Sequence, residues 1–217
     1  MQPVVDNIDL YVSGFFVSLG IAAWGALGSL VLGTVIATFR VSPVPVLRRL
    51  GTVYVEIIRN TPLTVVLILF GFGVPQAFGL AWGFYLSGTV GLVVYTSAFV
   101  CEAVRSGINS VSTGQAEAAR AIGLGFGQTL TLVVLPQALR TVVPPVGNVL
   151  IAMIKNSAVV GAVGVGGDLF SAYRRMSSAF GYERLPSITG TALGFLVMTL
   201  TAGALLAVTE RRTAVAR

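Results

Sequence analysis

The chain has no histidine, a single cysteine and a single lysine among its 217 residues. Without histidine, the serine–histidine–aspartate set of hydrolases cannot form, and the commonest metal ligand is missing. One cysteine, Cys101, excludes an internal disulfide and any CxxC metal or redox motif. Glycines gather at 123–127 and 161–167, but neither stretch continues into the Gly-Lys-Ser/Thr of a phosphate-binding loop. We therefore expect no catalysis and no ATP hydrolysis by this chain.

Charged residues are also scarce. They make up 10% of the chain, against about 25% in ordinary soluble domains, while the mean hydropathy is +0.88. Most of the chain must therefore lie in lipid, and at this length a single domain over 1–217 is expected. On a soluble protein the net charge of +6 would indicate a nucleic-acid partner. Here the arginines gather at the ends of apolar segments, a pattern of membrane topology, so we expect no nucleic acid.

Long runs without any charge set the first membrane spans. Leu10–Phe39 holds one helix of the roughly 20 residues that a bilayer requires. Asn60–Cys101 is 42 residues long; as one helix it would measure about 63 Å, twice a hydrocarbon core of about 30 Å. It must therefore turn back near the glycine, proline and glutamine at 71–76. This predicts two spans, at about 53–73 and 84–105.

The second half of the chain predicts two further spans. One runs over about 137–156, and Pro144 and Pro145 should bend or break it, because proline lacks the N–H of a helix interior. Residues 161–184 are too polar to span and are expected to form a short outer helix or a re-entrant piece. The last span occupies the charge-free run 185–209.

Positive charges orient these five spans. Residues 1–9 are acidic and lack the positive start of a signal peptide, so we expect no cleaved signal peptide. Arginines follow the first span, end the third and close the fifth, which places the N-terminus outside and the C-terminus inside a bacterial cytoplasmic membrane. These arginines are Arg40, Arg48, Arg49, Arg105, Arg211 and Arg212.

A polar island interrupts the apolar runs at 112–136. Ser112 and Gln115 have the spacing of a capping box, good helix formers follow, and Gly123 supplies the usual stop. The predicted helix has about three turns and is about 15 Å long. Its small alanine side chains would let the groove of another protein approach closely. The alternative is an amphipathic helix that lies on the membrane surface.

The same island carries a family resemblance. Glu117–Ala119 is followed after three residues by Gly123, and after nine more by Val133-x-Leu135-Pro136. This resembles the EAA loop of ABC importer permeases, with Val133 where isoleucine is usual. The flanking Gly114-Gln115 and residues 137–140 resemble the polar amino-acid branch of that family.

The resemblance implies an all-α membrane protein of about five transmembrane helices. Its core would be the MetI-like permease core of ABC type I importers, with a cytoplasmic coupling loop at about 106–135. Two ATPase subunits, which hold ATP and magnesium, would dock there, so the chain itself is neither an enzyme nor a cofactor-binding protein. A second permease subunit, identical or different, and an extracytoplasmic substrate-binding protein complete the assembly. The residues implied in docking are Ala116, Glu117, Ala118, Ala119, Arg120 and Gly123.

A second motif precedes the second predicted span. Glu56–Leu63 resembles the family segment E-x-x-R-G-T-P-L, with Asn60 in place of glycine. Glu56 and Arg59 are i, i+3 neighbours on a helix and can pair. The functional interpretation is that this segment braces the helix facing the translocation path. The alternative is a solvated pair at the membrane surface.

Lys155 is the sharpest candidate for a substrate contact. About 22 Å of helix separates it from Arg140, so it should lie deep in the membrane, where an ionisable residue marks a substrate path unless it snorkels outward. The family usually has aspartate where this chain has Asn156, and the more positive site favours an acidic ligand. Glu102 is expected to neutralise Lys155 or Arg105, and the nearby hydroxyl residues can equally be packing residues. The candidate path comprises Thr61, Pro62, Thr96, Ser97, Glu102, Lys155, Asn156 and Ser157.

Together these features predict the transmembrane subunit of an ATP-driven importer for a polar amino acid, with glutamate favoured. A basic or neutral polar amino acid is the alternative within the family. Outside it, the alternatives are a passive channel or a membrane assembly protein without transport activity. A passive pore has no reason to keep the EAA spacing.

Overall fold

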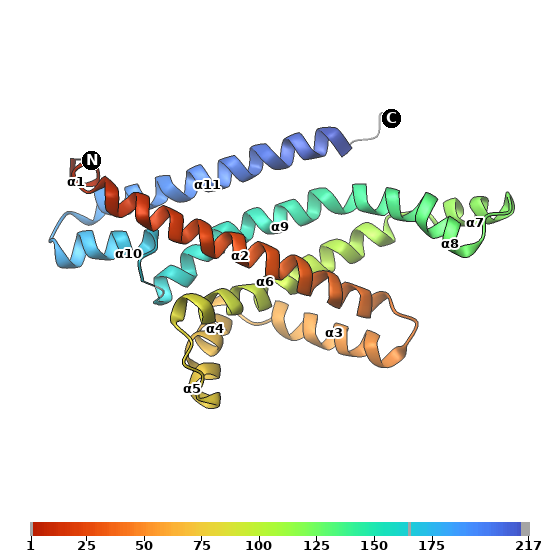
Figure 1. Cartoon of the computed structure of the whole chain (residues 1–217), viewed down its shortest axis with the longest axis horizontal. Coiled ribbons are helices and arrows are strands. Elements are labelled where there is room, and N and C mark those ends of the chain that lie inside the picture. The colour runs from red at the N-terminus through yellow and green to blue at the C-terminus, as the bar shows by residue number, and fades with distance from the viewer. Residues whose placement is uncertain (1, 165, 214–217) are drawn as a thin grey trace.

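The computed structural model describes residues 2–164 and 166–213, and the regular elements in these ranges are all helical (Figure 1). The long helices are α2 (Ile8–Val41), α6 (Phe84–Asn109), α9 (Leu135–Val163) and α11 (Arg184–Thr213). The short helices are α1 (Gln2–Asp6), α3 (Pro45–Arg59), α4 (Leu63–Ile68), α5 (Val74–Phe78), α7 (Thr113–Ala121), α8 (Phe126–Gln128) and α10 (Leu169–Arg174). Three π-helical segments extend them: η1 (Leu69–Gly73), η2 (Thr129–Val134) and η3 (Arg175–Ala179).

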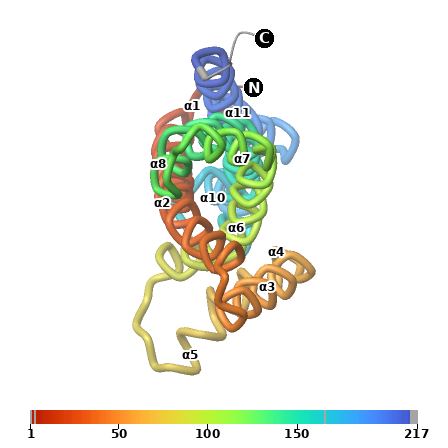
Figure 2. The backbone as a smooth tube through the Cα atoms, turned by 90° about the vertical axis from the view of Figure 1, so that its right-hand side faces the viewer, coloured from red at the N-terminus to blue at the C-terminus, as the bar shows by residue number. Residues whose placement is uncertain are grey.

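The long helices lie side by side as a membrane bundle. In the described ranges, four stretches are long and apolar enough to cross a bilayer, or five if the bent pair of α3 with α4 and α5 counts as one span. The prediction of an all-helical membrane protein with about five spans is confirmed. The N-terminus and α7 lie at opposite ends of the bundle (Figure 1). Seen along its long axis, α11 lies on one side and α3 to α5 on the other (Figure 2).

Glycines set the closest helix contacts in the bundle. A Cβ on Gly33 of α2 would lie 2.6 Å from Val100 of α6, and one on Gly107 of α6 would lie 2.2 Å from Val142 of α9. Only a residue without a side chain allows such approaches, and packing of small residues is how membrane helices associate without a hydrophobic drive. Thr141 adds a hydrogen bond of 3.0 Å from its hydroxyl to the Gly107 carbonyl. Helices α2, α6 and α9 therefore form the rigid centre.

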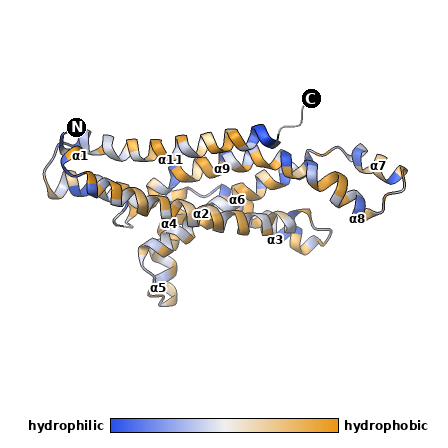
Figure 3. Cartoon of the chain, turned by 45° about the horizontal axis from the view of Figure 1, so that its top comes forward, coloured by the Kyte–Doolittle hydropathy of each residue, from blue (hydrophilic) through white to orange (hydrophobic). Residues whose placement is uncertain are grey.

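The outer faces of the long helices are apolar, as a lipid-facing surface should be. In the most apolar window of α11, 11% of the residues are buried, and its leucines and valines point outward. Figure 3 shows hydrophilic residues gathered instead at the C-terminal end of α11 and in α7. Exposed leucine side chains are therefore expected along the membrane spans, where they face lipid. They are not expected at the end of the bundle.

The predicted span at 53–73 is not one straight helix. Helix α3 ends at Arg59, α4 begins at Leu63, and the two pieces meet at 105°. Pro62 sits at the break in an extended conformation and precedes the first residue of α4. A proline disfavours helical geometry in the residue before it and has no N–H to continue the ladder. The absence of charged residues located the apolar run, but it carries no information about a bend within the run.

Of the bend or break predicted at Pro144 and Pro145, the break is absent, and a bend stays a prediction. Helix α9 continues through both prolines from Leu135 to Val163. Each proline removes one backbone donor, but in a membrane the packing of neighbouring helices keeps such a helix intact. The contact of Val142 with Gly107 lies just before the two prolines, so α6 holds α9 at that point.

Residues 161–184 form the short helical piece that was predicted, with Val165 outside the described residues. Helix α10 and η3 pack against α2, α9 and α11 at the end of the bundle away from α7 (Figure 1). Asp168, 1% exposed, caps α10 by accepting from the backbone N–H of Phe170 and of Ser171. Ser18 of α2 accepts from the Leu169 N–H at 3.1 Å. These bonds fix the piece to the bundle.

Candidate functional site

Helix α7 is built by local signals. It starts after Ser112, as predicted, although the Ser112 side chain makes no cap hydrogen bond, so the expected capping box is not formed. Its end matches the prediction: Gly123 has φ +92°, the Gly123 N–H donates to the Arg120 carbonyl, and the Leu124 N–H donates to the Ala119 carbonyl. This pair of bonds is a Schellman motif, which glycine favours because a Cβ is penalised at positive φ.

Most of the residues predicted for docking are accessible on the surface of α7. Glu117, Ala118, Arg120 and Gly123 are exposed, and Ala116 is half-buried. Ala119 differs, because it is 5% exposed and its methyl group is covered by this chain itself.

Two large apolar residues next to α7 were not singled out from the sequence. Ile122 is 80% and Phe126 72% exposed. They follow α7 in the chain, and α7 lies at one end of the bundle (Figure 1). Apolar side chains so exposed at the end of the bundle are typical of a protein contact.

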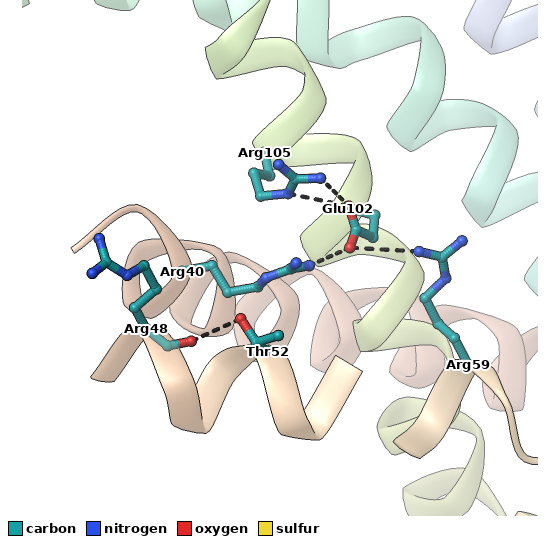
Figure 4. Close-up of polar contacts among 6 residues, drawn as sticks. All are labelled: Arg40, Arg48, Thr52, Arg59, Glu102 and Arg105. Carbon is teal, nitrogen blue, oxygen red and sulfur yellow. Dashed lines mark hydrogen bonds and ion pairs between the residues drawn. The ribbon is translucent and has the colours of Figure 1, made fainter. Parts of the chain in front are cut away.

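A second polar centre lies inside the bundle around Glu102 of α6 (Figure 4). One carboxylate oxygen accepts from Arg40 of α2 and lies 3.5 Å from a guanidinium nitrogen of Arg59 of α3. The other accepts from Nε and Nη2 of Arg105, at 3.2 and 2.9 Å. Three guanidinium groups thus share one carboxylate, which leaves two positive charges in excess. The predicted pairing of Glu102 with Arg105 is present, and that with Lys155 is not.

Arg59 does not pair with Glu56, its expected partner. It approaches Glu102 instead, and its guanidinium carbon lies 5.6 Å from the centre of the Phe99 ring. Helix α3 packs against both α2 and α6. The tertiary neighbour therefore displaced the local i, i+3 pair.

Two cavities meet along one face of α6. The smaller, about 130 Å³, lies between α6 and α9 and is lined by Thr96 and Phe99 on one side and Asn156 on the other. The larger, about 370 Å³, lies at the charge cluster, where Phe99 and Glu102 form part of its wall. Phe99 belongs to both linings. The face formed by Tyr95, Phe99 and Glu102, at i, i+4 and i+7, is therefore one continuous strip.

Thr96 is the most unusual polar group of this strip. It is 3% exposed, and among the described residues its hydroxyl has no hydrogen-bond partner. A buried hydroxyl without a partner costs about 1–3 kcal/mol. Thr96 lines the smaller cavity, and a buried hydroxyl without a partner is a feature that packed interiors usually avoid.

Three other hydroxyl residues of the predicted path already make hydrogen bonds within the chain. Ser97 and Ser157 are buried and already bonded, Ser97 to the Tyr54 hydroxyl at 2.8 Å and Ser157 to the Ile154 carbonyl at 2.7 Å. They act as packing residues in this state. Thr61 bonds to the Ile57 carbonyl.

Thr61 and Pro62 lie at the corner between α3 and α4, outside the linings of both cavities. Lys155 is exposed on α9, next to the cavity residue Asn156, and makes no contact with the charge cluster. The structure therefore brings Thr96 and Asn156 together and leaves Lys155 at the surface of the isolated chain.

Sequence reasoning missed Tyr95, Phe99 and Arg40. The spacing of the two aromatic residues before Glu102 is a helical signal that could have placed them on its face. Nothing in the sequence pairs Arg40 with a residue 62 positions later.

Residues 29–215 match the family described as the binding-protein-dependent transport system inner membrane component. The chain belongs to this permease family. The resemblance stated from the EAA spacing is thereby confirmed.

Relatives of this permease have been named for several amino acids. The chain is 44% identical over 163 residues to the glutamate transport system permease protein GluC of Corynebacterium glutamicum, covering 70% of this chain and 72% of that one. It is 45% identical over 158 residues to the probable glutamine ABC transporter permease protein GlnM of Bacillus subtilis, covering 73% of each. The arginine transport system permease protein ArtQ of the same organism is 31% identical and is covered over 90% of its length.

Solved structures agree with the fold of this permease. The crystal structure of an amino acid ABC transporter with histidines matches with a TM-score of 0.89 at 32% identity, covering 96% of both chains. The inward-facing MetNI methionine ABC transporter matches with a TM-score of 0.77 at 22% identity, over 96% of this chain and 98% of that one. The predicted MetI-like fold is thereby confirmed.

Proposed function

We propose that this permease is the transmembrane subunit of an ATP-driven importer for a polar amino acid, with glutamate as the favoured substrate. Membership in the family, the relatives named for glutamate, glutamine and arginine, and the fold of an amino acid ABC transporter all support an amino-acid importer. The observation that carries the path is the Thr96 hydroxyl, buried without a partner at a cavity wall opposite Asn156.

The substrate path follows the strip on α6. An amino acid needs polar partners in a low-dielectric cavity, because a bare charge there is heavily penalised. Thr96 and Asn156 offer neutral hydrogen bonds, and the charge cluster offers the positive field. The cavities of about 350 and 440 Å³ at α11 have largely apolar linings. Their polar side chains are Thr209 and Tyr11, whose hydroxyls already donate to the carbonyls of Leu205 and Ser187.

Glutamate is favoured because of Lys155. It is the only lysine of the chain, lies beside Asn156 rather than beside an acid, and has no ion-pair partner in the part of the chain that the structure describes. In the assembled pore its exposed ammonium group faces either the substrate or a second permease subunit. A carboxylate side chain of the substrate would be its natural counter-ion.

The partners are assigned from α7. Two ATPase subunits would dock on α7 of two permease subunits, and Ile122 and Phe126 would be covered in this contact. Closing the ATPase dimer on ATP would draw the two α7 helices together and turn the pore outward, toward an extracytoplasmic binding protein that delivers the substrate. Resetting after hydrolysis would release the substrate inside.

ATPase stimulation and uptake by the reconstituted complex test this function. Glutamate, glutamine and arginine are offered in turn with the cognate binding protein, and ATP-dependent uptake of one of them is expected. Uptake that proceeds without ATP would favour a passive channel. No uptake and no stimulation with any amino acid would leave an assembly protein as the better interpretation.

Lys155→Met tests the preference for glutamate. It keeps most of the volume and removes the charge. Loss of a charge-assisted hydrogen bond costs about 1.5–3 kcal/mol, or roughly ten- to a hundredfold in affinity. Glutamate uptake should fall accordingly while ATPase docking survives. Unchanged affinity for glutamate would reduce Lys155 to a snorkelling residue.

The proposed orientation has the N-terminus outside and the C-terminus inside. It is checked with single cysteines replacing Asp6, Arg48, Glu117 or Arg212 in a Cys101→Ser background. An impermeant thiol reagent added to intact cells should label Asp6→Cys alone. Labelling of Glu117→Cys from outside would overturn the orientation and the docking assignment together.

A further inference from the structure

The cavity at the charge cluster has one arginine that is not satisfied by the protein. The side chain of Arg40 is 14% exposed, that of Arg105 36% and that of Arg59 46%. Arg40 and Arg105 make direct hydrogen bonds to Glu102. The contacts of Arg59 in the described residues are a long ion pair of 3.5 Å and the face of the Phe99 ring. Most of its five N–H donors are therefore open to a ligand.

Arg59 and an acidic residue line the same cavity. Glu56 lies one helical turn before Arg59 on α3, and both belong to the wall of the cavity of about 370 Å³. The Glu56 side chain is exposed, and no ion pair or hydrogen bond of its carboxylate is present in the described residues. The wall thus offers an unpaired carboxylate and an under-used guanidinium about one turn of helix apart.

This pair matches the head of a free α-amino acid. A guanidinium group binds a carboxylate through two parallel hydrogen bonds, and a carboxylate binds an ammonium group. Every free α-amino acid carries both groups on one carbon atom. Phe99 lies in the lining of this cavity and in that of the cavity at Thr96 and Asn156, so the two cavities are neighbours on the same face of α6.

We propose that the cavity at Arg59 is a second, transient binding site for the substrate, on the α7 side of Phe99. Arg59 binds the α-carboxylate and Glu56 the α-ammonium group, so the site recognises the head common to all amino acids and leaves side-chain selection to Thr96, Asn156 and Lys155. Arg40 shares one carboxylate oxygen of Glu102 with Arg59 and so keeps that oxygen from neutralising Arg59 fully, whereas Arg105 binds the other oxygen. This inference rests on the proposed function, because it requires an amino-acid substrate.

The test reads the cavity directly. Asn60, which also lines it, is replaced by cysteine in a Cys101→Ser background, in the nucleotide-free complex with its ATPase subunits in lipid nanodiscs. The rate of reaction with a neutral maleimide is measured with increasing L-glutamine and with isoglutamine, whose α-carboxylate is an amide. L-glutamine should slow the reaction and isoglutamine should not. Protection by isoglutamine alone would overturn the assignment of the α-carboxylate.

Two substitutions then identify the contacts. Arg59→Gln should raise the L-glutamine concentration needed for protection about tenfold or more, the effect of losing one charge-assisted hydrogen bond. Glu56→Gln should act in the same direction. Its carboxylate has no partner within residues 2–164 and 166–213, so this change breaks no contact that holds the site together. Arg48→Cys, on the same helix but outside the cavity, should react without any protection.

Arg105→Gln is the matched control. It removes one positive charge from the same Glu102 carboxylate, but Arg105 does not line the cavity. The L-glutamine concentration needed to protect Asn60→Cys should stay within about threefold of its value with Arg105 present. An equal loss with Arg105→Gln and Arg59→Gln would mean that only the field of the cluster matters, and would overturn the direct contact.

The inference and the function fail in different ways. ATP-driven uptake by a complex whose Asn60→Cys is never protected would rule out the transient site and leave the importer intact. Absence of uptake and of ATPase stimulation with every amino acid would remove the proposed function and this site with it.

Discussion

Helix α7 and the Glu102 cluster are the two polar regions of this permease, and they are built in opposite ways. The start and the end of α7 are set by residues within a dozen positions of one another, at Ser112, Gly123 and Leu124. The Glu102 cluster joins α2, α3 and α6, and its longest link connects residues 62 positions apart. One region is exposed at the end of the bundle, and the other is half-buried within it.

Because of this difference, substitutions in the two regions should affect different properties of the protein. A change on α7 meets little of the chain itself, so it should affect a partner and leave stability intact. A change at Glu102 removes a group that three helices share, so it should affect the fold first. The predictions below use this contrast, starting from the largest expected effect.

Gly123→Asp should have the largest effect, on transport alone. A side chain at φ +92° costs about 1–2 kcal/mol and disturbs the end of α7, and the new charge enters the docking face. ATP-driven uptake should fall more than tenfold, while the amount of membrane-inserted protein stays unchanged on immunoblots. Gly123→Asn adds a side chain of the same size at the same backbone angle but no charge, so it should retain more uptake. Normal uptake with the aspartate would remove the docking assignment of α7.

Glu102→Gln should lower the stability of the purified complex. It leaves three guanidinium groups without a counter-charge, at a cost of about 1.5–3 kcal/mol, which corresponds to a Tm decrease of about 3–10 °C. The same substitution at the exposed Glu117 of α7 should change Tm by about 1 °C or less. Adding Arg40→Gln to Glu102→Gln should recover part of the loss, because the two residues are coupled. Equal Tm values for the two single variants would remove the contrast between the regions.

Thr96→Val should have the smallest effect. It is informative because Tm and substrate affinity should not fall together. Valine keeps the shape and removes a hydroxyl without a protein partner, so Tm should stay the same or rise. Substrate affinity should fall about two- to tenfold, the value of one neutral hydrogen bond. Ser97→Ala should do the reverse, because that hydroxyl bonds to Tyr54: Tm falls and affinity stays. A lower Tm for Thr96→Val with unchanged uptake would make Thr96 a packing residue.

Local signals explain which parts of the molecule could be predicted. The end of α7 at Gly123 follows from backbone geometry that only nearby residues influence. The number of spans follows from apolar length against bilayer thickness, and the long helices α2, α6 and α11 lie where charge counting placed them. Two details failed because tertiary neighbours decide them. Pro62 turned a predicted span into a corner, and Arg59 approaches Glu102 and does not pair with Glu56.

The sequence by itself determined that the chain is a helical membrane protein, that α7 ends at Gly123 and that its spacing belongs to a permease family. These properties depend on composition, on short-range hydrogen bonds and on a fixed motif, all of which are evident in the linear sequence. Only the tertiary structure decided that Thr96 faces Asn156, that Phe99 lines two cavities and that one carboxylate serves three arginines. Contacts between distant helices depend on rotation and crossing, which close glycine packing such as that of Gly33 fixes and which charge counts leave undetermined.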